Sequence, residues 1–408
     1  MKTVRDLIEI LEKNKCLSLD EYKFILDNYT VEDTEFAKKL AVNIRKSVYG
    51  NSVYIRGLIE VSNYCKNGCL YCGINRDNKS CSRYRLTKEE ILSCCENGYK
   101  LGFRTFVLQG GEDNHFTDEF VCDTVREIKK KYPDCAVTLS LGEKCYDSYK
   151  ALYEAGADRY LLRHETADSE HYSKLHPSDL SLKTRMDCLY NLKSIGYQVG
   201  CGIMVGSPYQ TNEHIAKDLK FIEEFDPQMC GIGPFLPHKD TVFADKEKGS
   251  FELTLFLLSL IRIMKPSILL PSTTALGTLK DGGREMGILA GANVIMPNLS
   301  PDTAKDKYML YDNKLRTGLE SVEGLETLKK KFADIGYEIV TDRGDYKASY
   351  ADINSIELYD EVLLNNGRKA AIVEIFDNSF VADIETGDGD YDTRFIYPQQ
   401  ILKIIKHN

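Results

Sequence analysis

The feature that most limits the fold of this chain is an alternation of short β-rich runs with amphipathic helical stretches. Eight runs have the composition of buried strands: "VYIRGLIEV", "RTFVLQ", "AVTLSL", "RYLLR", "YQVGCGIMVG", "CGIGPFL", "SILLP" and "NVIMP". Eight βα units over roughly 250 residues are typical of a TIM-type (β/α)8 barrel, whose active site lies at the carboxyl ends of its strands. A doubly wound open sheet is the alternative, because pattern alone leaves the strand count open.

The segments on either side of this region have different patterns. Residues 1–50 have helical periodicity, with a capping box at Ser18 and Glu21, and predict an N-terminal helical extension of a barrel that spans 51–347. Residues 352–408 read as short strands separated by turns such as "NNGR" and "TGDGD", and they resemble small SH3-like β-barrels. From Ser349 onward the chain has eleven acidic and five basic residues. We therefore expect a separate, acidic all-β domain at the C-terminus.

Charge and cysteine usage limit the classes of function. The net charge of -9 argues against a nucleic-acid-binding protein, which needs a basic face to neutralise phosphates. No apolar run approaches the roughly 20 residues of a membrane span, and the start "MKTVRDLIEILEKNK" lacks a signal-peptide core. Thirteen cysteines are an odd number in a long chain without an export signal, so reduced thiols are expected. We expect a cytoplasmic protein that binds neither membrane nor nucleic acid.

Three cysteines, Cys65, Cys69 and Cys72, stand close together in "NYCKNGCLYCGINRDN". A structural zinc site usually has four Cys or His ligands, and Cys81 or His115 would have to supply the fourth at an unusual spacing. An iron-sulfur cluster held by three thiolates instead leaves one iron with an open position. S-adenosylmethionine (SAM) can chelate that iron through its amino and carboxylate groups and be cleaved to methionine and a 5′-deoxyadenosyl radical. The spacing favours this radical chemistry.

The wider sequence around the cysteines is more specific. CxxxCxxC resembles the radical SAM superfamily, and "IEVSNYCKNGCLYCGINRDN" resembles the HydE family, the radical SAM maturases of FeFe-hydrogenase. The similarity continues through "VLQGGEDN", "DRYLLRHETAD", "GIGPFLPHKDT", "STTALGT" and "GANVIMPN", and so covers about residues 1–347. It implies a full (β/α)8 barrel in which the adenosyl radical attacks the sulfur of a cysteine-bound iron carbonyl cyanide precursor. Related sulfur-containing small molecules are also accepted in that family.

The resemblance also implies a set of SAM contacts. The residues that match the family's motifs are Tyr71, Gly110, Gly111, Glu112, Ser140, Glu165 and Arg185. Glycines permit a close approach to the methionine amino group, and the guanidinium fork of Arg185 suits the SAM carboxylate. Tyr71 suits an adenine contact. Without the surrounding match, each would be read as a surface, packing or helix-capping residue.

Predicted substrate contacts lie at strand ends or just beyond the eighth strand. They are Gln109, Arg163, Thr273, Thr274, Tyr308 and Tyr311. Together they offer hydrogen bonds to an anion or to metal-bound cyanide. Arg163 has the alternative role of a structural arginine inside the barrel.

Two departures from the family pattern qualify the resemblance. No cysteine follows Cys230, so the second cluster of some family members cannot form, and we expect one 4Fe-4S cluster. The C-terminal segment lies outside the family. The alternative hypothesis is therefore a paralogue that acts on another small sulfur-containing or amino-acid-derived substrate. A non-catalytic iron-sulfur scaffold is the third hypothesis.

The expected partners follow from the same hypotheses. They are other hydrogenase maturation proteins and an electron donor such as a flavodoxin or ferredoxin. The acidic C-terminal segment is either a solvated cap on the barrel or a docking module for a basic surface of a partner.

Overall fold

The computed structural model describes residues 2–314, 322–347, 355–364, 368–376, 379–386, 390–396 and 400–407. The chain divides into two compact units. The larger unit consists of Met1–Glu223 and Pro227–Asp345, and the smaller one consists of Glu224–Asp226 and Tyr346–Asn408.

Three helices precede the barrel: α1 (Val4–Asn14), α2 (Leu19–Asn28) and α3 (Val31–Tyr49). Each begins at a capping box, and the one predicted at Ser18 and Glu21 is confirmed, because each residue's side chain accepts a hydrogen bond from the other's backbone N–H. These caps satisfy backbone donors that would otherwise have no partner at the start of a helix. Helix α3 packs on α10 (Phe251–Met264), whose side chains are nearly all buried.

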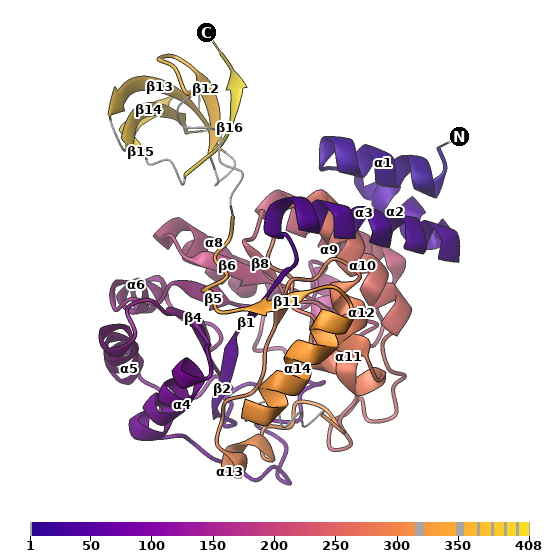
Figure 1. The fold of residues 1–408 in the computed structure, drawn as a ribbon, viewed down its shortest axis with the longest axis vertical. Coiled ribbons are helices and arrows are strands. Elements are labelled where there is room, and N and C mark those ends of the chain that lie inside the picture. The colour runs from indigo at the N-terminus through magenta and orange to yellow at the C-terminus, as the bar shows by residue number, and fades with distance from the viewer. Residues whose placement is uncertain are drawn as a thin grey trace. The chain divides into compact units, whose positions relative to one another are not determined.

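Seven of the eight predicted runs contain strands of a parallel barrel, and "SILLP" joins it through isolated bridges, which confirms the predicted fold class (Figure 1). Six of them pair in the order β2-β3-β4-β5-β6-β8. Their bounds are β2 (Gly57–Ser62), β3 (Thr105–Gly110), β4 (Ala136–Ser140), β5 (Arg159–Leu161), β6 (Gln198–Cys201) and β8 (Met229–Cys230). Bridges at Leu269 and Pro271 join β8 to β10 (Val294–Ile295), which pairs with β1 (Ser52–Ile55) and so closes the ring. The first run is divided, because Arg56 separates β1 from β2.

Helices lie outside the strands in the barrel unit (Figure 1). Besides α10 they are α4 (Lys88–Lys100), α5 (Asp118–Lys131), α6 (Tyr146–Glu154), α7 (Ser169–Leu175), α8 (Leu182–Ile195), α9 (Asn212–Phe225), α11 (Thr274–Leu279), α12 (Gly283–Ile288), α13 (Asp302–Lys305) and α14 (Val322–Asp334). Two short strands, β7 (Met204–Val205) and β9 (Gly233–Pro234), continue the pairing of β6 and β8 toward their carboxyl ends.

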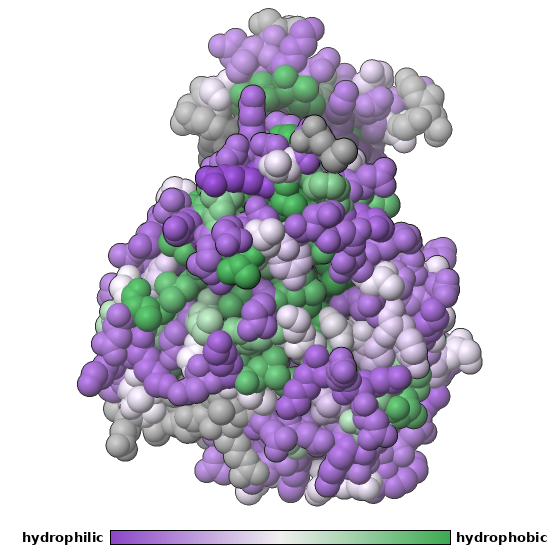
Figure 2. Space-filling model, turned by 90° about the vertical axis from the view of Figure 1, so that its right-hand side faces the viewer, coloured by the Kyte–Doolittle hydropathy of each residue, from purple (hydrophilic) through white to green (hydrophobic). Residues whose placement is uncertain are grey.

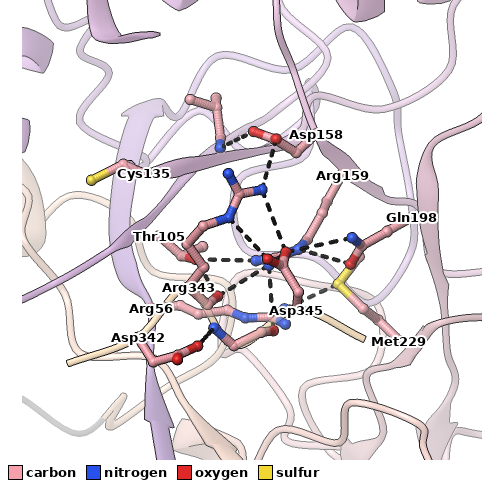
Figure 3. Close-up of polar contacts among 12 residues, drawn as sticks. Arg56, Thr105, Cys135, Asp158, Arg159, Gln198, Met229, Asp342, Arg343 and Asp345 are labelled. Carbon is pink, nitrogen blue, oxygen red and sulfur yellow. Dashed lines mark hydrogen bonds and ion pairs between the residues drawn. The ribbon is translucent and has the colours of Figure 1, made fainter. Parts of the chain in front are cut away.

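The amino end of the barrel is closed by the last residues of the larger unit. Strand β11 (Glu338–Val340) pairs in parallel with β1, and the chain then turns at Gly344, whose φ of 59° suits glycine. The fully buried guanidinium of Arg159 donates to Thr105 Oγ1 at 3.1 Å, to the carbonyl of Arg343 at 3.0 Å and to Asp345 Oδ1 at 2.6 Å (Figure 3). Asp345 thus neutralises an arginine inside the barrel.

The C-terminal unit is an antiparallel sheet of five strands in the order β15-β14-β13-β12-β16, which confirms the predicted all-β architecture. The strands are β12 (Glu361–Leu364), β13 (Lys369–Phe376), β14 (Ser379–Glu385), β15 (Tyr391–Ile396) and β16 (Ile401–Lys406). Along β14 burial alternates, with Phe380, Ala382 and Ile384 facing the core. This period of two is typical of a sheet with one buried face.

Hydrophilic residues dominate the face of the molecule drawn in Figure 2, with small apolar patches between them. Among the described residues, no helix has the length and apolar character needed to cross a bilayer.

Candidate active site

The CxxxCxxC segment forms the loop that follows β2, at the carboxyl end of the barrel. Backbone hydrogen bonds tie it to distant parts of the barrel: Lys66 N–H donates to Glu112, Leu70 N–H to Leu175, and Gly73 N–H to Leu310. Inside the loop, the guanidinium of Arg83 donates to four carbonyls, those of Asn63, Ile74, Asn75 and Asn78. The loop is therefore held from several sides.

The three thiols of this loop are only partly accessible. Burial raises the pKa of each of them, to about 12 for Cys69, where the neighbouring Cys65 raises it further. Such thiols remain protonated until a cation is bound, because metal binding displaces the proton. In the described parts of the chain, no three His, Cys, Asp or Glu side chains converge as the ligands of a single ion do. In a cluster that takes one thiolate per iron, the ligand sulfur atoms lie further apart than the ligands of a single ion do.

The loop after β3 carries the predicted contacts Gly110, Gly111 and Glu112 and lies against the cysteine loop. A Cβ on Gly111 would come within 2.2 Å of the carbonyl oxygen of Tyr64, so only glycine fits there. Gly142 has a φ of 79°, and a Cβ on it would overlap the side chain of Glu112. Glu112 is buried and fixed between these two loops.

Arg185 projects from α8 into the same end of the barrel and is buried. Its Nε donates to Glu143 Oε1 at 2.5 Å, and its Nη1 donates to the carbonyl of Arg163 at 2.8 Å. Its Nη2 lies 4.0 Å from Glu112 Oε1, beyond hydrogen-bond distance. The protein thus uses two of the five N–H groups of the guanidinium, and the others remain for a ligand such as the predicted SAM carboxylate. Ser140 ends β4 opposite Gln109 of β3.

Glu165 follows β5 and has a φ of 66°, which is unusual for a residue other than glycine. Its N–H donates to the carbonyl of Gly202 at 3.0 Å, and its carboxylate lies 3.0 Å from Arg163 Nη2. The preceding His164 is fully buried, accepts at Nδ1 from the N–H of Gly202, and lies 3.5 Å from Asp218. These contacts hold the strained residue in place, as is common at functional sites.

Tyr71 and α7 form an aromatic group beside the cysteines. The hydroxyl of Tyr71 lies 3.2 Å from Nε2 of His176, and the ring of His176 stacks on Tyr172 with centroids 3.9 Å apart. Tyr172 is 1% exposed, and its hydroxyl has no hydrogen-bond partner.

The predicted substrate residues fall into two places. Gln109 Nε2 lies 3.4 Å from the hydroxyl of the buried Tyr308. At the start of α11, Thr274 Oγ1 accepts from Arg284, while the hydroxyl of Thr273 has no partner. Burial raises the pKa of Tyr311 to about 12, and Arg284 and Arg163 are among the charges that act on this tyrosine.

Several buried polar atoms at the carboxyl end have no hydrogen-bond partner. They are Arg163 Nε, Tyr172 Oη and Thr273 Oγ1. Glu165 Oε2 lies 3.0 Å from Arg163 Nη2, and Glu112 Oε2 lies 3.4 Å from Lys66 Nζ, so these three atoms are ion-paired. Leaving such groups unpaired costs about 1–3 kcal/mol each, so native proteins seldom keep them without a ligand. Donors and carboxylates together suit a zwitterionic ligand such as the amino-acid end of SAM.

Comparison with known proteins decides the family. The sequence model of the Radical SAM superfamily matches residues 59–222. The FeFe-hydrogenase maturase subunit HydE of Thermotoga maritima is 45% identical over 316 residues, which cover 77% of this chain and 89% of that protein. The chain belongs to the HydE family of radical SAM enzymes. Like the superfamily, it binds a 4Fe-4S cluster and SAM.

Two further relatives are methylornithine synthases, and a third protein shares the fold. The 3-methylornithine synthase of Methanosarcina acetivorans is 29% identical over 79% of this chain and 90% of its own length. The crystal structure of methylornithine synthase (PylB) superposes with a TM-score of 0.70, at 27% identity, over 82% of this chain and 97% of that one. The hydrogenase maturase HydG shares the fold, with a TM-score of 0.68 at 21% identity over 82% of this chain and 75% of HydG.

The structure brings residues to this end that the sequence interpretation missed. Glu143 pairs with Arg185, and Tyr172 stacks on His176. Glu60 is buried at the end of β2 and pairs with Lys314, which also donates to the carbonyl of Tyr308 at 3.0 Å. Glu143 lies three residues after Ser140, which is a usable signal, whereas nothing local marks Tyr172.

Proposed function

We propose that this chain is a FeFe-hydrogenase maturase that acts on a cysteine-bound iron carbonyl cyanide precursor. The observation that carries the proposal is the 45% identity to HydE of Thermotoga maritima over nearly all of that protein. The unpaired Nε–H of Arg163 and hydroxyl of Thr273 support it, because a cyanide or carboxylate group would satisfy them. When bound, the cluster and SAM supply a 5′-deoxyadenosyl radical.

The residues of the chain then have distinct proposed roles. Cys65, Cys69 and Cys72 hold the cluster. Gly110, Gly111, Glu112, Ser140, Glu165 and Arg185 bind the methionine and ribose parts of SAM, and Tyr71 contacts its adenine. Tyr172 donates its buried hydroxyl to the carboxylate end of SAM. Gln109, Arg163, Thr273, Thr274, Tyr308 and Tyr311 orient the substrate.

Partners and location form part of the same proposal. A flavodoxin or ferredoxin delivers electrons to the cluster in the cytoplasm, and the product passes to another hydrogenase maturation protein. The loop that carries the cysteines exposes Lys66, Arg76 and Lys79 on an otherwise acidic chain. Arg76 pairs with Asp179 and Lys66 lies 3.4 Å from Glu112, so Lys79 is the cation of this group that suits an acidic electron carrier best.

A second candidate function is the conversion of an amino-acid-derived substrate. It is favoured by the superposition on methylornithine synthase, which covers 97% of that enzyme. The two candidates differ in what stimulates SAM cleavage.

The test is an anaerobic assay of the reconstituted enzyme with SAM and a strong reductant, which measures 5′-deoxyadenosine. We expect the synthetic cysteine-bound iron carbonyl cyanide complex to accelerate SAM cleavage and to be consumed. Stimulation by free amino acids alone would favour the second candidate, and a complete lack of SAM cleavage would favour a scaffold.

A pair of variants tests the substrate residues. Tyr308→Phe removes the hydroxyl that lies beside Gln109, and it should slow consumption of the iron complex while SAM cleavage persists. Tyr197→Phe is the matched control, because Tyr197 is equally buried but donates to the backbone of Tyr149 on the outside of the barrel.

A further inference from the structure

The C-terminal sheet has an aromatic outer face. Residues paired across two antiparallel strands lie on the same side of the sheet. Tyr391 and Phe395 of β15 are paired with outward-facing residues of β14, and so is Phe376 of β13, so all three rings point outward. These three side chains, which we call the aromatic face, are 66%, 58% and 43% exposed. The rings of Phe376 and Phe395 contact each other, with centroids 5.7 Å apart.

Carboxylates surround this face. Glu374 lies opposite Val381, Asp383 opposite Thr393, and Glu385 opposite Tyr391, so all three acids share the outward side with the aromatic rings. Arg394 is the single basic residue of β14 and β15; it alternates to the other side and pairs with Asp392. Lys369 of β13 falls on the same side, opposite Glu385 in the register that pairs Ala370 with Ile384. The face therefore combines apolar rings with three carboxylates and one lysine, which leaves it with a net negative charge.

Strand β15 ends the described sheet, because it pairs with β14 and with no other described strand. Such an edge presents backbone N–H and C=O groups to an incoming strand. Natural edges are protected by lysine, proline or inward-pointing charges. Strand β15 has no lysine or proline in "YDTRFI", and its two inward-pointing charges, Asp392 and Arg394, pair with each other.

We propose that the aromatic face binds an extended basic segment of a partner protein. The segment lies along β15, its arginine or lysine side chains stack on the aromatic rings, and Glu374, Asp383 and Glu385 neutralise their charge. A nucleic acid or an anionic membrane is disfavoured, since the face would repel phosphate. A second copy of this chain is also disfavoured, because a two-fold contact would place the same carboxylates opposite each other. The inference does not depend on the proposed enzymatic function.

The experiment uses the full chain and a synthetic twelve-residue peptide of alternating arginine and valine that carries one tryptophan. The protein contains no tryptophan, so the fluorescence anisotropy of the peptide reports binding without background. We expect saturable binding that weakens at least tenfold between 50 and 300 mM salt, since exposed charge pairs are screened by salt (about 10 Å Debye length at 0.1 M). A peptide with glutamate in place of arginine should not bind.

Variants locate the contact. Tyr391→Ser with Phe395→Ser, and separately Asp383→Lys with Glu385→Lys, should each raise the dissociation constant of the basic peptide at least tenfold. The control for the charge reversal is Glu32→Lys with Glu154→Lys, which makes the same change of charge at exposed sites of the barrel unit. Ile405→Ser controls for the loss of an exposed apolar side chain elsewhere on the C-terminal sheet.

Four results would overturn the proposal. They are the lack of saturable binding up to millimolar peptide, equal binding of the acidic peptide, unchanged affinity in both test variants, and a wild-type dimer that Phe395→Ser converts to a monomer. The last result would assign the face to a second copy of the chain. A circular dichroism spectrum equal to that of the wild type is required of each variant.

Discussion

A comparison of Arg185→Ala with Glu143→Gln separates the contact of Arg185 with SAM from its contacts with the protein. In the structure Nε donates to Glu143 and one N–H of Nη1 donates to the carbonyl of Arg163, so we expect the N–H groups of Nη2 to be the main donors to the SAM carboxylate. One hydrogen bond to a charged group contributes about 1.5–3 kcal/mol. The dissociation constant of SAM should therefore rise about 10- to 150-fold, which is less than the loss of a complete bidentate fork would cause.

The assay is a titration of SAM into the reduced, reconstituted protein, followed by the change in the EPR signal of the cluster. Glu143→Gln is the matched variant, because Glu143 contacts Arg185 at 2.5 Å and is not itself a proposed SAM contact. We expect it to weaken SAM binding less than Arg185→Ala, with full iron content in both. Unchanged affinity in Arg185→Ala, or equal losses in the two variants, would refute direct donation by Nη2.

Other consequences can be measured independently. Reconstitution should give about four irons per chain, and eight irons would contradict a single cluster. Cys65→Ala should lose the iron while Cys81→Ala keeps it, since a 4Fe-4S cluster here has three protein thiolates. Tyr172→Phe should weaken SAM binding about three- to tenfold. It should leave the unfolding free energy of the apo-protein unchanged or up to about 1 kcal/mol higher, because it removes a buried hydroxyl without a partner. A clear loss of stability in this variant would exclude this reasoning. Burial lowers the pKa of His171 and of His176 to about 4, so both side chains are neutral in the folded protein near pH 7. As the pH falls below about 6.5, the two histidines become protonated in the unfolded chain before they do so in the folded protein. Each should therefore cost about 2 kcal/mol of stability between pH 7 and pH 5, measured by urea unfolding of the apo-protein, and replacing both by glutamine should flatten that dependence.

The sequence predicts the barrel well because parallel strands covered by helices are nearly continuous apolar runs. The helix caps are predictable for a similar reason: Thr3, Ser18 and Thr30 act within three residues of themselves. The strand "SILLP" is harder to delimit, since it joins its neighbours only through bridges at Leu269 and Pro271. Local pattern locates an element better than it locates its ends.

The polar contacts of the site were less predictable. Glu60 meets its partner across the barrel, since the Glu60–Lys314 pair joins residues 254 positions apart. Nothing in a local window encodes such a pairing, because it depends on how β2 and the loop after α13 are brought together by the closed ring. The same limit applies to the contacts of Arg185 with Glu143 and with the carbonyl of Arg163, which no local window predicts.

The closure of the amino end by Asp345 has a consequence for how this chain can be rebuilt. The carboxylate that neutralises Arg159 lies at the last position of the larger unit, just before Tyr346. A gene fusion or exchange made after residue 345 would therefore keep the barrel sealed and its arginine paired, whereas a junction a few residues earlier would leave a bare cation in the interior. We therefore expect an exchange of residues 346–408 to leave the buried contacts of Arg159 with Thr105 and Asp345 intact.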